Sequence, residues 1–102
     1  TDIFLKARAG DHDTAMVDAA IERARAYADA GASGFFAPGL ADVALVERLV
    51  AGSPLPVNLM AFPGGPERSE WATAGVARIS HGPFPYRAAL AGFEAGLQAA
   101  LR

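Results

Sequence analysis

The chain has 102 residues, of which 52% are hydrophobic, and a net charge of −2 at pH 7. This size and apolar content are typical of one globular domain, and the nearly balanced charge, without a basic run, argues against nucleic acid and membrane surfaces as partners. Cysteine is absent, which excludes disulfides, thiolate nucleophiles and cysteine-ligated metals within these residues. The absence of cysteine leaves the compartment open, with the cytoplasm as the default expectation. No apolar run reaches the roughly 18–20 residues that a membrane-spanning helix needs.

The first predicted element is a helix that follows the polar residues Asp11, His12 and Asp13. Its apolar residues recur every three or four positions, at Met16, Val17, Ala20, Ile21, Ala24, Tyr27 and Ala28. Gly31 suits the left-handed position that often follows a helix. We interpret Asp11, His12 and Asp13 as helix-capping residues rather than as a metal cluster, because adjacent residues of a loop point in different directions.

The rest of the chain alternates short apolar runs with helical periodicities. Each short run, bounded by glycine or proline, predicts a buried parallel strand, and there are three of them, at 34–37, 56–61 and 76–80. Helices are predicted at 43–50, at 69–74 and after residue 83. Ser69 is the expected cap of the short middle helix. The last helix carries a single apolar stripe, which consists of Tyr86, Leu90, Phe93, Leu97 and Leu101.

This alternation of strands and helices predicts an α/β fold with a parallel sheet and right-handed crossovers. No linker or low-complexity stretch divides the chain, so we treat residues 1–102 as a single domain fragment. Three strands alone would leave sheet edges and one face of the sheet exposed. Half of a (β/α)8 TIM barrel explains this deficit best. A small doubly wound sandwich is the alternative.

Five segments, in their order and spacing, carry a resemblance to a known family. They are Thr1-Asp2, Glu22–Tyr27 with Ala30-Gly31-Ala32, Phe35–Leu40, Pro56–Met60 and Gly75–Ser80. Over nearly its whole length the chain resembles the C-terminal half of the barrel in the isocitrate lyase/phosphoenolpyruvate mutase superfamily. In this comparison Thr1-Asp2 is similar to the end of the family's Ala-Arg-Thr-Asp strand. We therefore expect the chain to begin in the middle of a barrel.

The resemblance implies a Mg²⁺-dependent enzyme that makes or breaks a bond next to the carboxylate of a small 2-oxo or 2-hydroxy acid, through an enolate. A hard divalent cation that bridges keto and carboxylate oxygens would stabilise the enolate charge. The resemblance places the Mg²⁺ ligands, the mobile loop with the lyase base and a carboxylate-binding arginine outside this chain. It also implies a homo-oligomer in which the C-terminal helix packs on a neighbouring subunit, although packing on its own barrel would explain the stripe equally well.

Pro38 departs from the family's lyase pattern. Lyases of the superfamily place a glutamate at this strand end, whereas proline can neither accept a proton nor join a cation network. The substrate of those lyases is therefore not carried over, and the Pro38-Gly39 pair resembles the phosphonomutase-like branch. Our first hypothesis is a carbon–carbon lyase. The alternatives are a P–C bond enzyme, of the phosphonopyruvate mutase or hydrolase type, and a non-catalytic half-barrel that self-associates.

The candidate substrate-binding residues are Asn58, Ser80, Met60, Thr1 and Asp2. Asn58 is predicted at a strand end, where barrel active sites lie, and in the resemblance it matches an asparagine of the substrate pocket. Ser80 could donate a hydrogen bond at the same mouth, and Met60 would make the pocket more apolar. Thr1 and Asp2 flank the position of the family's arginine, which Asp2 could orient. The alternatives are structural: loop or turn hydrogen bonds for the polar residues and core packing for the methionine.

Three further features are interpreted as structural. His81 follows the last strand and could act as an acid or base, but a surface-loop histidine is the preferred interpretation. The loop 62–66 has two prolines, which lack the amide donors of a phosphate cradle, so we predict a rigid turn. Trp71 is expected to be a packing anchor.

Overall fold

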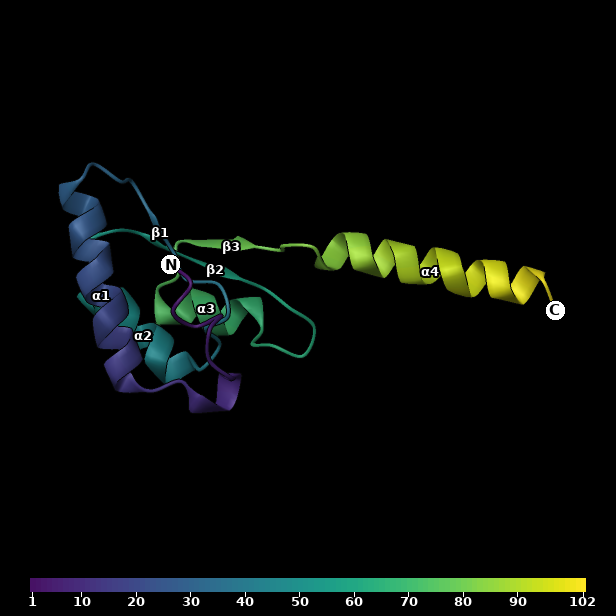
Figure 1. Cartoon of the computed structure of the whole chain (residues 1–102), viewed down its shortest axis with the longest axis horizontal. Helices are drawn as coiled ribbons and strands as arrows, with labels where there is room; N and C mark the ends of the chain where they lie inside the picture. The colour runs from purple at the N-terminus through teal and green to yellow at the C-terminus, as the bar shows by residue number, and fades with distance from the viewer.

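The computed structural model describes residues 1–102 and contains every helix and strand that the sequence predicts (Figure 1). The structure also contains a short 3₁₀ helix, η1, which the sequence analysis did not predict. The elements in chain order are η1 (Ala9–Asp11), α1 (Thr14–Asp29), β1 (Phe35–Phe36), α2 (Val43–Gly52), β2 (Val57–Met60), α3 (Arg68–Ala74), β3 (Arg78–Ser80) and α4 (Phe84–Ala100).

The three strands form one parallel sheet in the order β1-β2-β3, so strands that follow one another in sequence are also neighbours in space. Phe36 of β1 lies opposite Asn58 of β2, which in turn lies opposite Arg78 of β3. Two residues further along the strands, Met60 lies opposite Ser80. This register brings every second residue of the three strands to the same face of the sheet.

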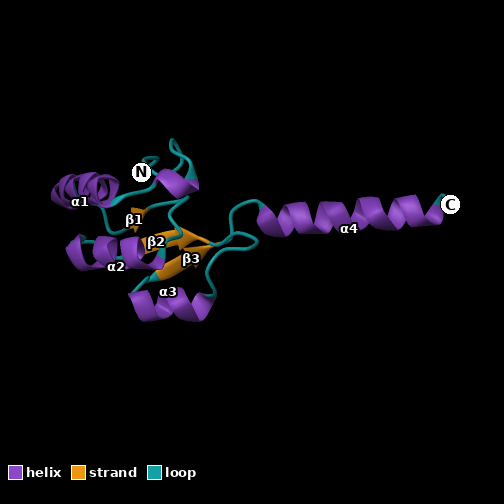
Figure 2. Ribbon diagram, turned by 90° about the horizontal axis from the view of Figure 1, so that it is seen from below, coloured by secondary structure: helices purple, strands orange, loops and turns teal.

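Helices α1, α2 and α3 all cover one face of the sheet, and α2 packs between the other two (Figure 2). Val57 and Leu59 point to this covered face and are fully buried. A doubly wound sandwich would have helices on both faces. The one-sided cover is the arrangement of a barrel wall, and the predicted partial (β/α)8 barrel is confirmed.

The hydrophobic core lies between the sheet and these helices. Its largest fully buried side chains are Trp71, Phe4, Phe35, Leu40, Leu49 and Leu59. Phe4 joins it from the N-terminal segment, which passes directly over Gly39. A Cβ atom at Gly39 would meet the Phe4 carbonyl at 3.2 Å, and φ is +95° there, so both the backbone and the packing require glycine.

The helix starts agree with the sequence except at α3. Asp13 caps α1 by accepting a hydrogen bond from the Met16 backbone N–H at 2.9 Å. The prediction that Ser69 caps α3 is wrong, because the helix begins one residue earlier. Glu67 precedes the helix, and its backbone N–H donates to Oε2 of Glu70 at 2.7 Å, the reciprocal bond of a capping box.

Helix α4 extends away from the rest of the molecule (Figures 1 and 2). With α4 included, the molecule measures 58 Å along its longest axis and 28 and 26 Å along the other two. None of its residues is buried. Its apolar stripe lies open, with Tyr86, Phe93 and Leu101 exposed by 70%, 68% and 79%. The stripe therefore does not pack on the sheet of its own chain in this structure.

No helix combines the length and apolar character needed to cross a bilayer.

Candidate functional site

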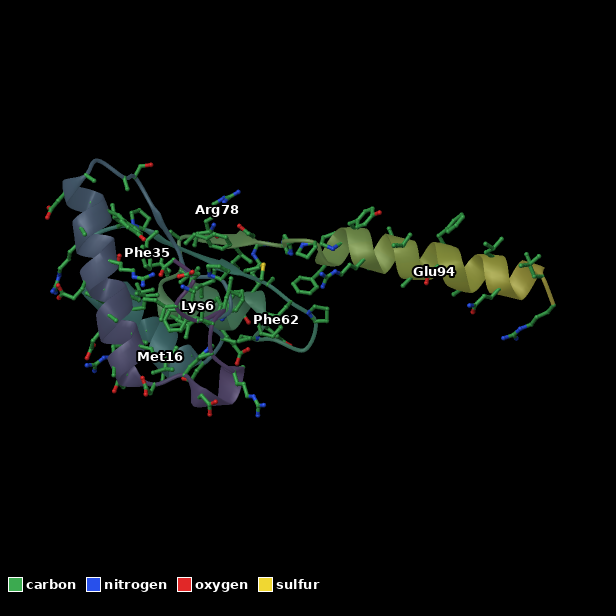
Figure 3. All side chains as sticks on the ribbon, in the orientation of Figure 1. Lys6, Met16, Phe35, Phe62, Arg78 and Glu94 are labelled. Atoms are coloured by element: carbon green, nitrogen blue, oxygen red, sulfur yellow. The ribbon has the colours of Figure 1, made fainter.

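The face of the sheet that no helix covers carries the main candidate residues. We call it the inner face and define it by Phe36, Asn58, Met60, Arg78 and Ser80, which the register places on one side of the three strands. Figure 3 shows Arg78 on this side of β3, opposite to α3. The inner face of a barrel wall leads to the carboxyl ends of the strands, where barrel active sites lie.

Asn58 and Ser80 form a hydrogen-bonded pair on the inner face. The Asn58 Nδ2 atom donates to the Ser80 Oγ at 3.0 Å, and this hydroxyl lies 3.2 Å from Asn58 Oδ1, to which it donates. Both side chains are half-buried. Asn58 is the second residue of β2 rather than its last, so it lies one layer below Met60. Ser80 ends β3 and connects this layer to the mouth of the site.

Met60 lies above Asn58 on the same face and is also half-buried. It is close to the loop after β3, since a Cβ atom at Gly82 would meet the Met60 sulfur at 2.6 Å. The thioether therefore forms an apolar wall beside the Asn58–Ser80 pair. The structure brings three of the predicted site residues together.

Arg78 is the member of the inner face that the sequence reasoning missed. Its Nη1 atom donates to the Ser80 Oγ at 3.4 Å, so the guanidinium extends from the first residue of β3 toward the last. The available signal was the spacing. Arg78 precedes Ser80 by two residues in a strand, which puts both side chains on one face.

The inner face has more hydrogen-bond donors than acceptors. Arginine carries five N–H donors and an amide two. Of these, Ser80 Oγ accepts one from Arg78 and one from Asn58. The remaining donors have no partner within the chain, and no carboxylate belongs to this face. Such a surface is chemically suited to bind an anion.

Thr1 and Asp2 lie beside the end of β1, apart from the Asn58–Ser80 pair. The Thr1 backbone nitrogen donates to the Phe36 carbonyl at 2.8 Å, and the Thr1 hydroxyl accepts from Arg23 at 2.8 Å. The Asp2 carboxylate pairs with Lys6 at 2.8 Å and with Arg23 at 3.2 Å. Hydrogen bonds from these two cations, Lys6 first, lower the pKa of Asp2. No hydrogen bond joins Thr1 or Asp2 to Asn58 or Ser80.

The Asp11–Asp13 segment serves the N-terminal fold. Asp13 caps α1, as predicted. The His12 Nε2 atom lies 2.8 Å from the Phe4 carbonyl, and its ring packs edge-to-face on the Phe4 ring at 5.3 Å. The chain contains no group of three or more His, Cys, Asp or Glu side chains that could hold a metal ion.

Trp71 and His81 line a hollow of about 640 Å³ between α3 and β3, on the helix-covered side of the sheet. Trp71 is a packing anchor, as predicted, with 1% of its surface exposed. Its Nε1 atom has no hydrogen-bond partner. His81 is exposed in the loop after β3. The lining also includes Arg68 and Arg78, so the hollow extends along the free edge of β3. The other lining residues are apolar, with Val76 and Ile79 as the larger ones.

Comparison with known proteins identifies the family. Residues 1–101 match the phosphoenolpyruvate phosphomutase family. The chain belongs to this family. The superfamily that the sequence resembles is thereby confirmed.

Two solved structures of family type are close in fold. One is a protein of Burkholderia cenocepacia J2315 provisionally assigned as a phosphonomutase, with 50% identity and a TM-score of 0.94 over 98% of this chain. The other, from the same organism, is provisionally assigned as a lyase/mutase, with 34% identity and a TM-score of 0.74 over 84% of this chain. This chain covers 40% and 32% of those chains, respectively.

Two curated relatives are uncharacterized proteins from two strains of Mycobacterium tuberculosis, each 36% identical over 92 residues. The match takes in 87% of this chain and 35% of each relative. The chain thus spans about a third of the length of the curated relatives it matches. The activity of a complete family member is therefore a matter for proposal.

The residues of the inner face do not fit Mg²⁺, the cation expected for this family. Mg²⁺ prefers carboxylate and water oxygens in an octahedral arrangement. The inner face offers one amide oxygen, one hydroxyl and a guanidinium, which would repel a cation. Pro38, where family lyases have glutamate, is buried and adds no polar side-chain atom. We derive no step through a metal from these residues.

Proposed function

We propose that the chain is part of a barrel enzyme of lyase/mutase type that acts on a small 2-oxo or 2-hydroxy carboxylic acid. The enzyme would make or break a bond at the carbon beside the keto group, through an enolate, and a carbon–carbon lyase is the first candidate. The observation that carries this proposal is the hydrogen-bonded Asn58–Ser80 pair on the inner face of the sheet. Membership of the phosphoenolpyruvate phosphomutase family supports it.

In this proposal Asn58 binds and orients the substrate. One of its amide N–H groups donates to Ser80, and the other is free to donate to a carboxylate or enolate oxygen. Ser80 fixes the amide by contacting both its nitrogen and its oxygen. A donor that is already oriented stabilises negative charge as it develops, without reorganisation during the reaction. Met60 excludes water on one side of the pair. Proton transfer would rely on groups outside these residues.

A P–C bond enzyme is the second candidate, and two observations favour it. The 50% identical solved relative is the one provisionally assigned as a phosphonomutase. The inner face also supplies the donors that a phosphonate group requires, from Arg78 together with the Asn58–Ser80 pair. A phosphonate has three oxygens and accepts more hydrogen bonds than a carboxylate.

Turnover assays on the full-length natural protein test the two candidates. Both assays contain Mg²⁺. Turnover of oxaloacetate and of 2-hydroxy diacids is measured as release of a 2-oxo acid, and turnover of 3-phosphonopyruvate is monitored by ³¹P NMR. A carbon–carbon lyase consumes the former and leaves the phosphonate signal unchanged. A P–C bond enzyme shifts or removes the phosphonate signal. If neither substrate class reacts and neither binds, the enzymatic proposal fails and the non-catalytic half-barrel takes its place.

We also propose that the enzyme is a homo-oligomer in which α4 packs on another copy of the chain. Four residues of its stripe, Tyr86, Phe93, Leu97 and Leu101, are at least half exposed here, and large apolar patches on a protein surface mark contact sites. Replacing Phe93 with Asp should shift the full-length protein to a smaller species in size-exclusion chromatography with light scattering. Replacing Glu94, which is also exposed, with Gln is the matched control. An unchanged mass for the Phe93 variant would contradict this assembly.

A further inference from the structure

Arg78 is the only charged residue of the inner face, and the substrate contact proposed for Asn58 does not involve it. Its backbone pairs with Asn58 across the sheet, while its guanidinium reaches Ser80 at the end of the strand. The charge therefore lies at the level of the proposed substrate-binding pair and next to it. Figure 3 shows the side chain rising from the side of β3 that no helix covers.

The guanidinium of Arg78 has no acidic partner within the chain. All four ion pairs lie elsewhere: Asp2 with Lys6, Asp2 with Arg23, Glu22 with Arg25, and Asp18 with Arg48. The single bond to Ser80 leaves most of the five N–H donors of Arg78 free. The Arg78 side chain is exposed in this structure, and a guanidinium with free, parallel N–H donors is suited to bind an anionic group.

We propose that Arg78 is a specificity-determining residue that binds the second acidic group of the substrate, a carboxylate or a phosphonate. Asn58 then contacts the first carboxylate or the enolate oxygen. This assignment rests on the proposed function. A planar guanidinium suits both groups, because its parallel N–H donors bind two oxygens at once. The site would prefer 2-oxo acids with two acidic groups over pyruvate, which has only one.

Three variants of the full-length natural protein test this role. Arg78→Gln removes the charge, and Arg78→Lys keeps the charge but loses the paired donors. Arg25→Gln is the matched control, since it removes the same charge from an exposed ion pair on α1. Equilibrium binding and turnover are measured with oxaloacetate and 3-phosphonopyruvate as two-acid probes and with pyruvate as the one-acid probe.

For Arg78→Gln we expect the affinity for the two-acid probes to fall by about 10- to 100-fold, the effect of losing a hydrogen bond to a charged group. Pyruvate binding should change by less than about threefold. The affinity of Arg78→Lys for the two-acid probes should lie between that of Arg78→Gln and that of the unmodified protein. Arg25→Gln should bind all probes like the unmodified protein. The probe that loses more affinity identifies whether a carboxylate or a phosphonate is the natural partner.

Two results separate failure of this role from failure of the proposed function. If the unmodified protein binds the acids but Arg78→Gln weakens all three equally, or weakens none, the specificity role is overturned. An equal loss accompanied by a lower thermal midpoint would mean that Arg78 pairs with a carboxylate of the protein itself. If the unmodified protein binds none of the probes, the proposed function fails first.

Discussion

The two faces of the same three strands differ in what they do. On the helix-covered face, Val57 and Leu59 are fully buried among apolar side chains. On the inner face, the residues between and after them, Asn58 and Met60, are half-buried and lie beside polar groups. Because side chains alternate along a strand, neighbours in sequence belong to different faces. Stability and chemistry should therefore be separable by substitutions one residue apart.

The largest effect on stability should come from Leu59→Ala. Leu59 is fully buried, and truncation of such a side chain leaves a cavity that the surroundings fill only in part. We expect the free energy of unfolding of the full-length protein to fall by about 2–5 kcal/mol in urea titrations. Activity per folded molecule should be nearly unchanged. A variant that unfolds normally but has lost substrate binding would place Leu59 on the wrong face.

Asn58→Ala should show the opposite pattern. The free energy of unfolding should fall by only about 1–2 kcal/mol, because the two hydrogen bonds to Ser80 are lost at a half-buried position, where water can replace them. The value of kcat/KM, by contrast, should fall by about 10- to 100-fold, because the donor to the substrate anion is removed.

Asn58→Asp is a sharper companion to the alanine variant. It keeps the size of the side chain but replaces a donor with a negative charge, which should weaken binding of an anionic substrate further than alanine does. If Asn58→Asp restored activity relative to Asn58→Ala, the residue would act as an acceptor or base instead of a donor.

The sequence predicted the fold well because its strongest signals are local. The apolar run around Val57 marks a strand. Gly31, which was expected in the left-handed position after the first helix, has a φ of +98°, and Gly75 after α3 has a φ of +93°. The start of α3 was predicted wrongly for a local reason too. Ser69 is a good cap by residue type, but the pair of Glu67 and Glu70 forms a reciprocal cap, which moves the cap two residues earlier, from Ser69 to Glu67.

The site was predicted only in part because it depends on contacts between strands. The strand positions of Asn58 and Ser80 could be read from the sequence, but their hydrogen bond depends on how β2 and β3 align. Arg78 was missed for the same reason. An arginine in a strand is typical of a solvated position, so the two-residue spacing from Ser80 did not single it out. The pairing with Asn58 shows that it lies beside the candidate site.

The smallest expected effect on stability comes from the ion pair between α1 and α2, and it depends on pH. Asp18 of α1 accepts two hydrogen bonds from Arg48 of α2, at 2.9 and 3.1 Å, and these bonds lower the pKa of Asp18. The unfolded state then binds more protons in acid, so the pair stabilises the fold above the ordinary pKa of 3.8 and loses this contribution as the pH falls through the folded value.

Asp18→Asn should therefore lower the thermal midpoint slightly at pH 7, and the difference from the unmodified protein should vanish in strong acid. Both side chains are about half exposed, so the difference should also shrink in high salt. Asp29→Asn, which removes a carboxylate without an ion pair, is the control. A difference that persisted at acid pH would mean that Asp18 stabilises the contact between α1 and α2 by packing, and the helix layer would then depend on shape alone.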